Sequence, residues 1–141
     1  MIDVNIQREI DRLRQGGELN PDGVKAIAIG INHAFTELAA AWSKRFSIGA
    51  WVDLHTSAPT QLHFCRRPSI GGDVAWTFVI LYTHERDELR ISQANLEQRD
   101  AAARAVPLLY QKLIENGNAD KTKLLEAFDT VSKYAEKAID D

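Results

Sequence analysis

The sequence predicts an α+β domain in which two helices precede a four-stranded antiparallel β-meander and a C-terminal αα-hairpin follows it. Three observations predict this class: a long amphipathic stretch before residue 47, four strand patterns between residues 50 and 92, and two apolar helical stripes after residue 95. The chain has 141 residues, a length that suits one domain. Because no repeat, low-complexity segment or linker interrupts it, we predict a single domain over residues 1–141.

Two helices are expected before the sheet. The first is indicated by apolar residues at helical spacing, namely Ile6, Ile10 and Leu13. The second begins at Asn20-Pro21, an N-cap candidate followed by a proline whose missing N–H costs nothing at this position. Its apolar residues share one helical face, so we predict a helix over residues 21–46 that is the longest element, with Trp42 buried and His33 exposed.

Four strand patterns follow. The stretch Val74–Thr83 is apolar at both odd and even positions, which predicts a central strand that is covered on both faces. Residues 50–56, 61–66 and 88–92 alternate between two kinds of side chain, as strands with two different faces do. The short connections between the strands favour an antiparallel meander in which residues 74–83 have a neighbour on each side.

The turn between the first two strands sets their expected register. With Ala58-Pro59 as a two-residue loop, three cross-strand pairs follow: Trp51 with Arg66, Asp53 with Phe64, and His55 with Leu62. In this register Asp53 and His55 share one face of the sheet, and His63 points to the other face.

Two helices joined by a short loop are expected after the sheet. Asn95 and Gln98 resemble a capping box, and apolar residues recur at helical spacing from there to Ile114. Pro107 removes one helical hydrogen bond and predicts a kink or a break. Residues 116–118, Asn-Gly-Asn, predict the turn of an αα-hairpin. The helices either cover both faces of the sheet or lie on one face and leave the other open to a partner chain.

Charge and cysteine content narrow the classes of function. The chain carries 17 Lys and Arg against 20 Asp and Glu, interleaved, so there is no basic region to bind a nucleic acid. Cys65 is the only cysteine, which excludes an internal disulfide and fits a reducing compartment. The N-terminus lacks the basic start of a signal peptide, and no apolar run approaches about 18 residues. We therefore expect a cytoplasmic protein that binds neither membranes nor nucleic acids.

No catalytic or cofactor motif stands out, so we expect no cofactor and no metal, and we disfavour an enzyme. Asp53, His55 and His63 are residue types that bind metals or transfer protons, but the predicted register separates His63 from the other two. Cys65 is better interpreted as a small buried hydrophobe than as a nucleophile, because no histidine is tied to it. The glycine-rich loop at residues 70–73 lacks the lysine and the following helix of a phosphate-binding loop.

The surface of the early strands offers candidate binding residues instead, namely Trp51, Asp53, His55, Arg66 and Arg67. Trp and Arg are enriched at the centres of protein interfaces, and an edge strand can pair with another chain. The alternative for Trp51 and Arg66 is a cation–π contact that closes the protein's own core.

The leading hypothesis is a non-enzymatic cytoplasmic protein that binds another protein as an inhibitor, immunity protein, adaptor or chaperone, with a homodimer formed through the sheet. The alternative is a small-ligand-binding protein or small hydrolase that uses the sheet face around Asp53, His55 and Arg66. The layout would suit a small bacterial protein, including one encoded by a phage or a mobile element. A class I secretion chaperone shares the small, acidic, dimeric α+β character, but it normally has a helix between its strands.

Overall fold

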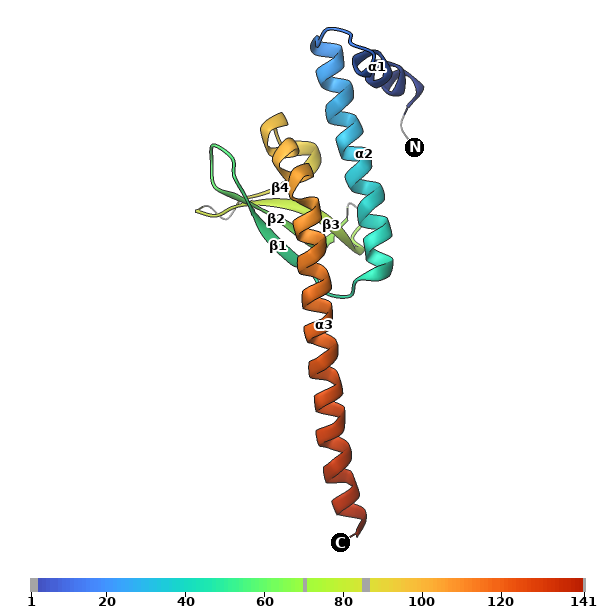
Figure 1. Cartoon of the computed structure of the whole chain (residues 1–141), viewed down its shortest axis with the longest axis vertical. Helices are drawn as coiled ribbons and strands as arrows, with labels where there is room; N and C mark the ends of the chain where they lie inside the picture. Colours follow the sequence, from blue (N-terminus) through green and yellow to red (C-terminus); the bar gives the residue numbers. More distant parts are fainter. Residues whose placement is uncertain (1–2, 70, 85–86, 141) are drawn as a thin grey trace.

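The computed structural model describes residues 3–69, 71–84 and 87–140 (Figure 1). The elements follow in the order α1 (Val4–Arg14), α2 (Pro21–Arg45), β1 (Ala50–Leu54), β2 (Thr60–Pro68), β3 (Val74–Tyr82), β4 (Glu88–Arg90), the 3-10 helix η1 (Ile91–Gln93) and α3 (Leu96–Asp140). The α+β class, the two preceding helices and the four-strand sheet are confirmed. The predicted C-terminal αα-hairpin is wrong, because α3 is one helix.

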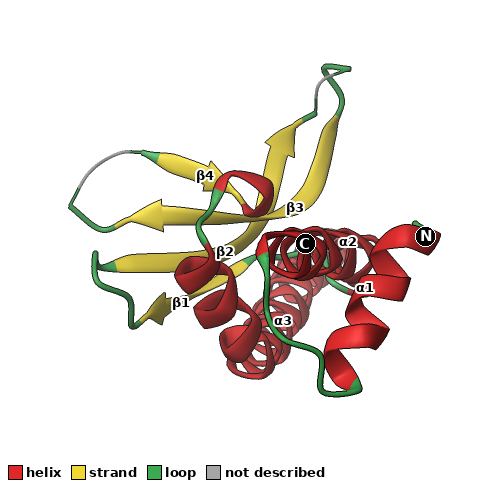
Figure 2. Ribbon diagram, turned by 90° about the horizontal axis from the view of Figure 1, so that it is seen from above, coloured by secondary structure: helices red, strands yellow, loops and turns green. Residues whose placement is uncertain are grey.

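The sheet is an antiparallel meander with the strand order β1-β2-β3-β4, so β3 has a neighbour on each side as predicted. Strand β4 pairs only with Val79–Leu81, and the first half of β3 has no described partner strand on that side. Both α2 and α3 lie against the same face of the sheet (Figure 2). No described helix lies against the other face, which we call the open face, and this decides between the two layer arrangements. The expected cover on both faces of β3 is therefore met only in part: Phe78 and Ile80 are buried under the helices, and Val79 is 0% exposed on the open face.

The core lies between the inner face of the sheet and helices α2 and α3. Trp42 is at its centre and contacts the rings of Phe46, Phe64, Phe78 and Tyr110, with ring centroids 5.3–6.0 Å apart. Aromatic pairs at this separation stabilise a core beyond the effect of their buried area. The predicted burial of Trp42 is confirmed, whereas His33, predicted to be exposed, is partly buried.

Helix α1 packs along the N-terminal part of α2, and two glycines of α2 permit the close approach. A Cβ atom on Gly23 would lie 3.1 Å from Leu13 Cδ1, and one on Gly30 would lie 3.1 Å from Ile10 Cδ1. These glycines weaken the helix by about 1 kcal/mol each relative to alanine, but they make room for the apolar side chains of α1. Asn20 caps α2 as predicted, since its Oδ1 accepts a hydrogen bond of 2.8 Å from the N–H of Gly23.

Helix α3 has 45 residues and is the longest element, so the prediction that α2 is the longest is wrong. It continues through Pro107, which is exposed, and through Gly117, whose backbone does not adopt a positive φ. Asn and Gly lower helix propensity by at most about 1 kcal/mol each, and do not forbid a helix. The Asn116 side chain also donates a hydrogen bond to the Gly49 carbonyl at 3.3 Å, which ties this part of α3 to the start of β1.

Candidate functional site

The open face of the sheet carries some of the predicted binding residues, in a register that differs from the expected one. Trp51 pairs with His63 and Asp53 pairs with Gln61, because residues 55–59 form a five-residue connection rather than a two-residue loop. The expected pairing of Trp51 with Arg66 is therefore wrong. The register shift is an odd number of residues, so His63 moves to the same face as Trp51 and Asp53.

Side chains on this open face interact with one another. The Trp51 and His63 rings stack with centroids 5.9 Å apart, and His63 Nε2 lies 3.1 Å from Gln61 Oε1. Gln61 Nε2 in turn donates to Asp53 Oδ1 at 3.3 Å. Burial, together with the positive charge of Arg67, lowers the pKa of His63 below its ordinary value, which favours the neutral imidazole. The amide of Gln61 thus lies between the histidine and the carboxylate.

Arg66 and Arg67 lie near the far end of β2 and point to opposite faces. The Arg66 guanidinium lies 5.2 Å from the centroid of the Trp76 ring, which stacks on the buried ring of Phe64. A cation–π contact at the edge of the core was the predicted alternative for Arg66, and here its partner is Trp76 instead of Trp51. Arg67 Nε donates to Glu88 Oε1 at 2.6 Å across the open face.

Cys65 also lies on the open face and is half-buried. Burial raises the pKa of its thiol, and this effect exceeds the opposing effect of the Arg67 charge. The thiol is therefore protonated at neutral pH and is a poor nucleophile. Among the described residues, no Ser, Thr or Cys side chain hydrogen-bonds to a histidine, the pairing on which many nucleophilic enzymes depend.

A shallow groove of about 460 Å³ lies between the edge strand β1 and helix α3. It brings together three of the five predicted binding residues, Trp51, Asp53 and His55, and adds Leu108 and Lys112 of α3. Arg66 and Arg67 do not line it. Sequence reasoning missed the two α3 residues because the contact between β1 and α3 joins positions more than 50 residues apart.

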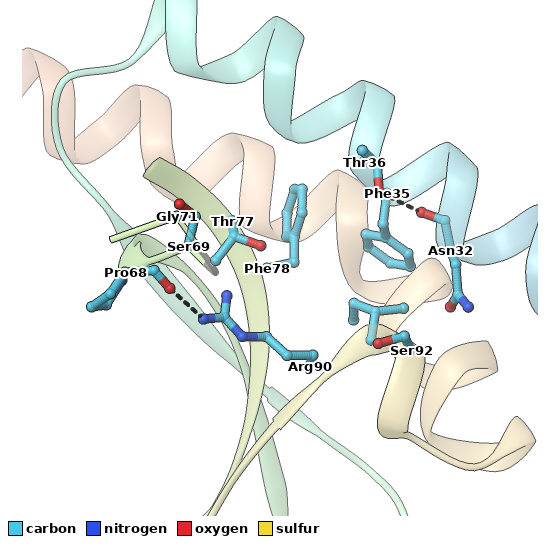
Figure 3. A pocket seen from close by; sticks show the side chains of 11 residues that line it. Asn32, Phe35, Thr36, Pro68, Ser69, Gly71, Thr77, Phe78, Arg90 and Ser92 are labelled. Carbon is cyan, nitrogen blue, oxygen red and sulfur yellow. Dashed lines mark hydrogen bonds between the residues drawn. The ribbon is translucent and has the colours of Figure 1, made fainter. Parts of the chain in front are cut away.

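A cavity of about 700 Å³ lies between α2, the β2–β3 connection and η1 (Figure 3). Phe35 and Phe78 form apolar walls, and the guanidinium of Arg90 lies at one side, where it donates to the Pro68 carbonyl at 3.1 Å. Asn32 Oδ1 is buried at this cavity and has no hydrogen-bond partner among the described residues. No local sequence motif marks these residues, so the sequence alone did not reveal the cavity.

The C-terminal half of α3 projects beyond the sheet and beyond α2 (Figure 1), and it carries several exposed large apolar side chains. Residues 118–140, which we call the arm, follow the last side chains of α3 that contact the domain. Every arm side chain from 118 to 131 is exposed. Five large apolar side chains of the arm are 56–68% exposed, namely Leu124, Leu125, Phe128, Val131 and Tyr134.

Four apolar residues lie along one side of the arm, and Leu125 and Tyr134 flank them on either side. Leu124, Phe128, Val131 and Ala135 are separated by four, three and four residues, so they share one helical face, which we call the spine. The opposite face is charged and includes Glu126, Asp129, Lys133, Glu136 and Lys137. The sequence predicts this apolar face correctly, but the expected hairpin would have placed it in a separate helix beside the first.

Comparisons of the chain with models of known protein families, with curated proteins and with solved structures found no match. Within residues 3–69, 71–84 and 87–140, no helix is both long and apolar enough to cross a membrane. In the same part of the chain, no three His, Cys, Asp or Glu side chains are grouped so that they could hold a metal ion.

Proposed function

We propose that this chain is a non-enzymatic protein that acts by binding proteins, as an inhibitor, immunity protein, adaptor or chaperone does. The observation that carries the proposal is the arm, on which five large apolar side chains are 56–68% exposed. Most helical stability in proteins comes from packing of an apolar face, and the apolar face of the arm packs against no other described residues. A protein partner that covers the spine supplies this packing.

The size of the exposed surface supports a macromolecular partner. At ~150–200 Å² for each large side chain when fully exposed, two thirds of five side chains gives roughly 500–650 Å² of apolar surface. The largest apolar patch on a typical monomer covers about 300–600 Å² and often has a function. An amphipathic helix that presents residues three and four positions apart is also a recurring mode of protein recognition.

The chemistry of the open sheet face supports the same proposal. Asp53, Gln61 and His63 bind one another, and Arg67 binds Glu88, so these groups hold the sheet surface in place. The thiol of Cys65 is protonated at neutral pH. Exposed Trp51, beside this ordered polar surface, offers a second position for a protein contact.

The proposal is tested by affinity capture and light scattering with three forms of the full chain: wild type, Phe128→Glu and Thr130→Glu. Thr130 is exposed and lies about 200° around the helix from Phe128, so its substitution adds the same charge to the opposite face. We expect the wild type and Thr130→Glu to bind one protein in a fixed ratio, either a protein from the source lysate or a second copy of the chain. Phe128→Glu should not bind this protein. A wild-type monomer that captures nothing, or capture that Phe128→Glu does not change, would refute the proposal.

A small-ligand-binding function is the second candidate, because Asn32 Oδ1 is buried at the cavity between α2 and η1 and no residue in the described part of the chain hydrogen-bonds to it. A ligand with a hydrogen-bond donor would satisfy this oxygen. Thermal shift assays with a panel of small polar metabolites should then show a stabilising compound whose effect is lost in Asn32→Leu. A panel that stabilises neither form would remove this candidate.

A further inference from the structure

We infer that the partner of the arm is a second copy of this chain, and that the two arms pair as antiparallel helices through their spines. The inference deepens the proposed function and rests on it, since it names the protein that covers the spine. Three features of the arm carry it: the sizes of the spine residues, the position of the arm relative to the domain, and the area and charge of the paired surface.

The sizes of the spine residues favour an antiparallel pair. Spacings of four, three and four residues are those of the two apolar positions of a helical heptad. When Phe128 faces Val131 of the partner subunit, Leu124 faces Ala135 of the partner subunit, and the symmetry repeats both pairs. Each of the four layers then combines a larger side chain with a smaller one, which fills the space between the helices evenly.

A parallel pair in register would pack less evenly. Phe128 would face its own copy in one layer, and Ala135 would face its own copy two layers away. The first layer would be crowded, and the second would leave a gap between the helices. Gaps and overpacking each destabilise an apolar interface by roughly 1 kcal/mol or more.

The antiparallel register also fits the position of the arm on the domain. Facing residue numbers add up to 259, so Asp140 of the partner subunit lies beside Ala119. The partner's arm therefore runs along residues that are exposed, and over the described length of α3 it stops before Asn116, which binds Gly49. The two arms overlap over residues 119–140, about 33 Å at 1.5 Å per residue. The two domains lie at opposite ends and do not collide.

The area and charge of the paired surface suit a dimer. When the flanking Leu125 and Tyr134 are covered together with the spine, the two arms bring together at most about 1,000–1,300 Å², which reaches the ~1,000 Å² expected of a specific interface. Over residues 118–140 the arm carries four lysines (121, 123, 133 and 137) and five acidic residues (120, 126, 129, 136 and 140). Four positive charges minus five negative charges is −1, so the net charges of two arms repel each other only weakly.

The first experiment measures the mass of the full-length chain by sedimentation equilibrium over a wide range of concentrations. We expect the wild type and Thr130→Glu to reach twice the chain mass, and Phe128→Glu to raise the dissociation constant at least about a hundredfold, since each dimer buries two glutamates in place of two phenylalanines. A wild type that is monomeric at all concentrations overturns the inference, as does a dimer that Phe128→Glu leaves intact. If the wild type is monomeric but captures another protein that Phe128→Glu does not capture, the dimer inference fails and the proposed function stands.

The second experiment tests the orientation by disulfide formation in a Cys65→Ala background. The double variant Leu124→Cys/Ala135→Cys should cross-link to a covalent dimer under mild oxidation. In the antiparallel register, the cysteine at position 124 faces the cysteine at position 135 of the partner subunit. The two positions are eleven residues apart on one helix, about 16 Å, too far for a bond within one chain. Leu124→Cys alone should stay uncross-linked. Efficient cross-linking of that single variant would show a parallel pair and overturn the antiparallel assignment.

Discussion

Two identical substitutions on α3 should have opposite consequences for stability. Leu113 and Leu124 are eleven residues apart, which is close to three helical turns, so both side chains point in nearly the same direction from the helix axis. Leu113 is 0% exposed in the core, whereas Leu124 is 65% exposed on the arm. Replacing each with alanine removes the same atoms from the same face of the same helix, and only the surroundings differ.

The expected magnitudes follow from those surroundings. Leu113→Ala leaves a cavity between α3 and the sheet, and should lower the free energy of unfolding by about 2–5 kcal/mol. Leu124→Ala removes no domain contact, so at low protein concentration the change should stay within about 0.5 kcal/mol. At high concentration the wild type gains stability from dimerisation, and Leu124→Ala should lose part of that gain.

Urea unfolding, followed by circular dichroism at two protein concentrations a hundredfold apart, measures these changes. The buried Trp42 provides fluorescence as a second probe of the core. Similar losses for the two variants at low concentration would contradict the assignment of the arm as a segment outside the domain. A loss below about 1 kcal/mol for Leu113→Ala would contradict the packing of α3 against the sheet.

Two further predictions concern the open sheet face. Because burial raises the pKa of the Cys65 thiol, iodoacetamide should alkylate the folded chain at pH 8 at least about ten times more slowly than the urea-unfolded chain. Mass spectrometry measures both rates, and equal rates would contradict this prediction. His63 has a pKa below 6.5 when folded, so the unfolded chain binds the proton more tightly. The free energy of unfolding should be highest above about pH 6.5 and fall as the pH drops through the lowered folded value. Urea midpoints between about pH 7 and 5 should show a smaller fall in His63→Gln than in the wild type, and an identical fall would count against this role of His63.

The fold could be predicted from the sequence where local patterns and tertiary packing agree. The apolar face of α2 ends at Trp42 in the core, and Asn20 caps that helix as its side chain and the following proline predict. Reciprocal hydrogen bonds between Asn95 and Gln98 likewise confirm the predicted capping box at the start of α3. In each case, interactions within a few residues fix the backbone.

The sequence misled where a weak local signal competed with a distant contact. Residues 116–118 carry turn-forming residue types, but the helix continues and the Asn116 side chain donates a hydrogen bond to the Gly49 carbonyl just before β1. The β1–β2 register depends on five connecting residues rather than on Ala58-Pro59 alone. The predicted register differs from the observed one by three positions. Because three is an odd number, each β1 residue was paired with β2 residues of the opposite face, and His63 was placed on the wrong face of the sheet.

The candidate site was predicted in part for the same reason. The apolar residues of the arm are visible in the sequence as a helical stripe, and Trp51, Asp53 and His55 do share one groove. Nothing local to the stripe tells whether it folds back or projects, since that depends on whether α3 turns at Gly117.

Because α3 is continuous, the rotation of the arm about the helix axis is fixed relative to the domain. Each residue turns the helix by about 100°, so deleting two residues near Gly117 would rotate the spine by roughly 200° relative to the sheet without changing either part. Deleting seven would turn it by only about 20° and shorten the connection by roughly 10 Å. The helix thus fixes both the direction in which the open sheet face points and its distance from whatever covers the spine.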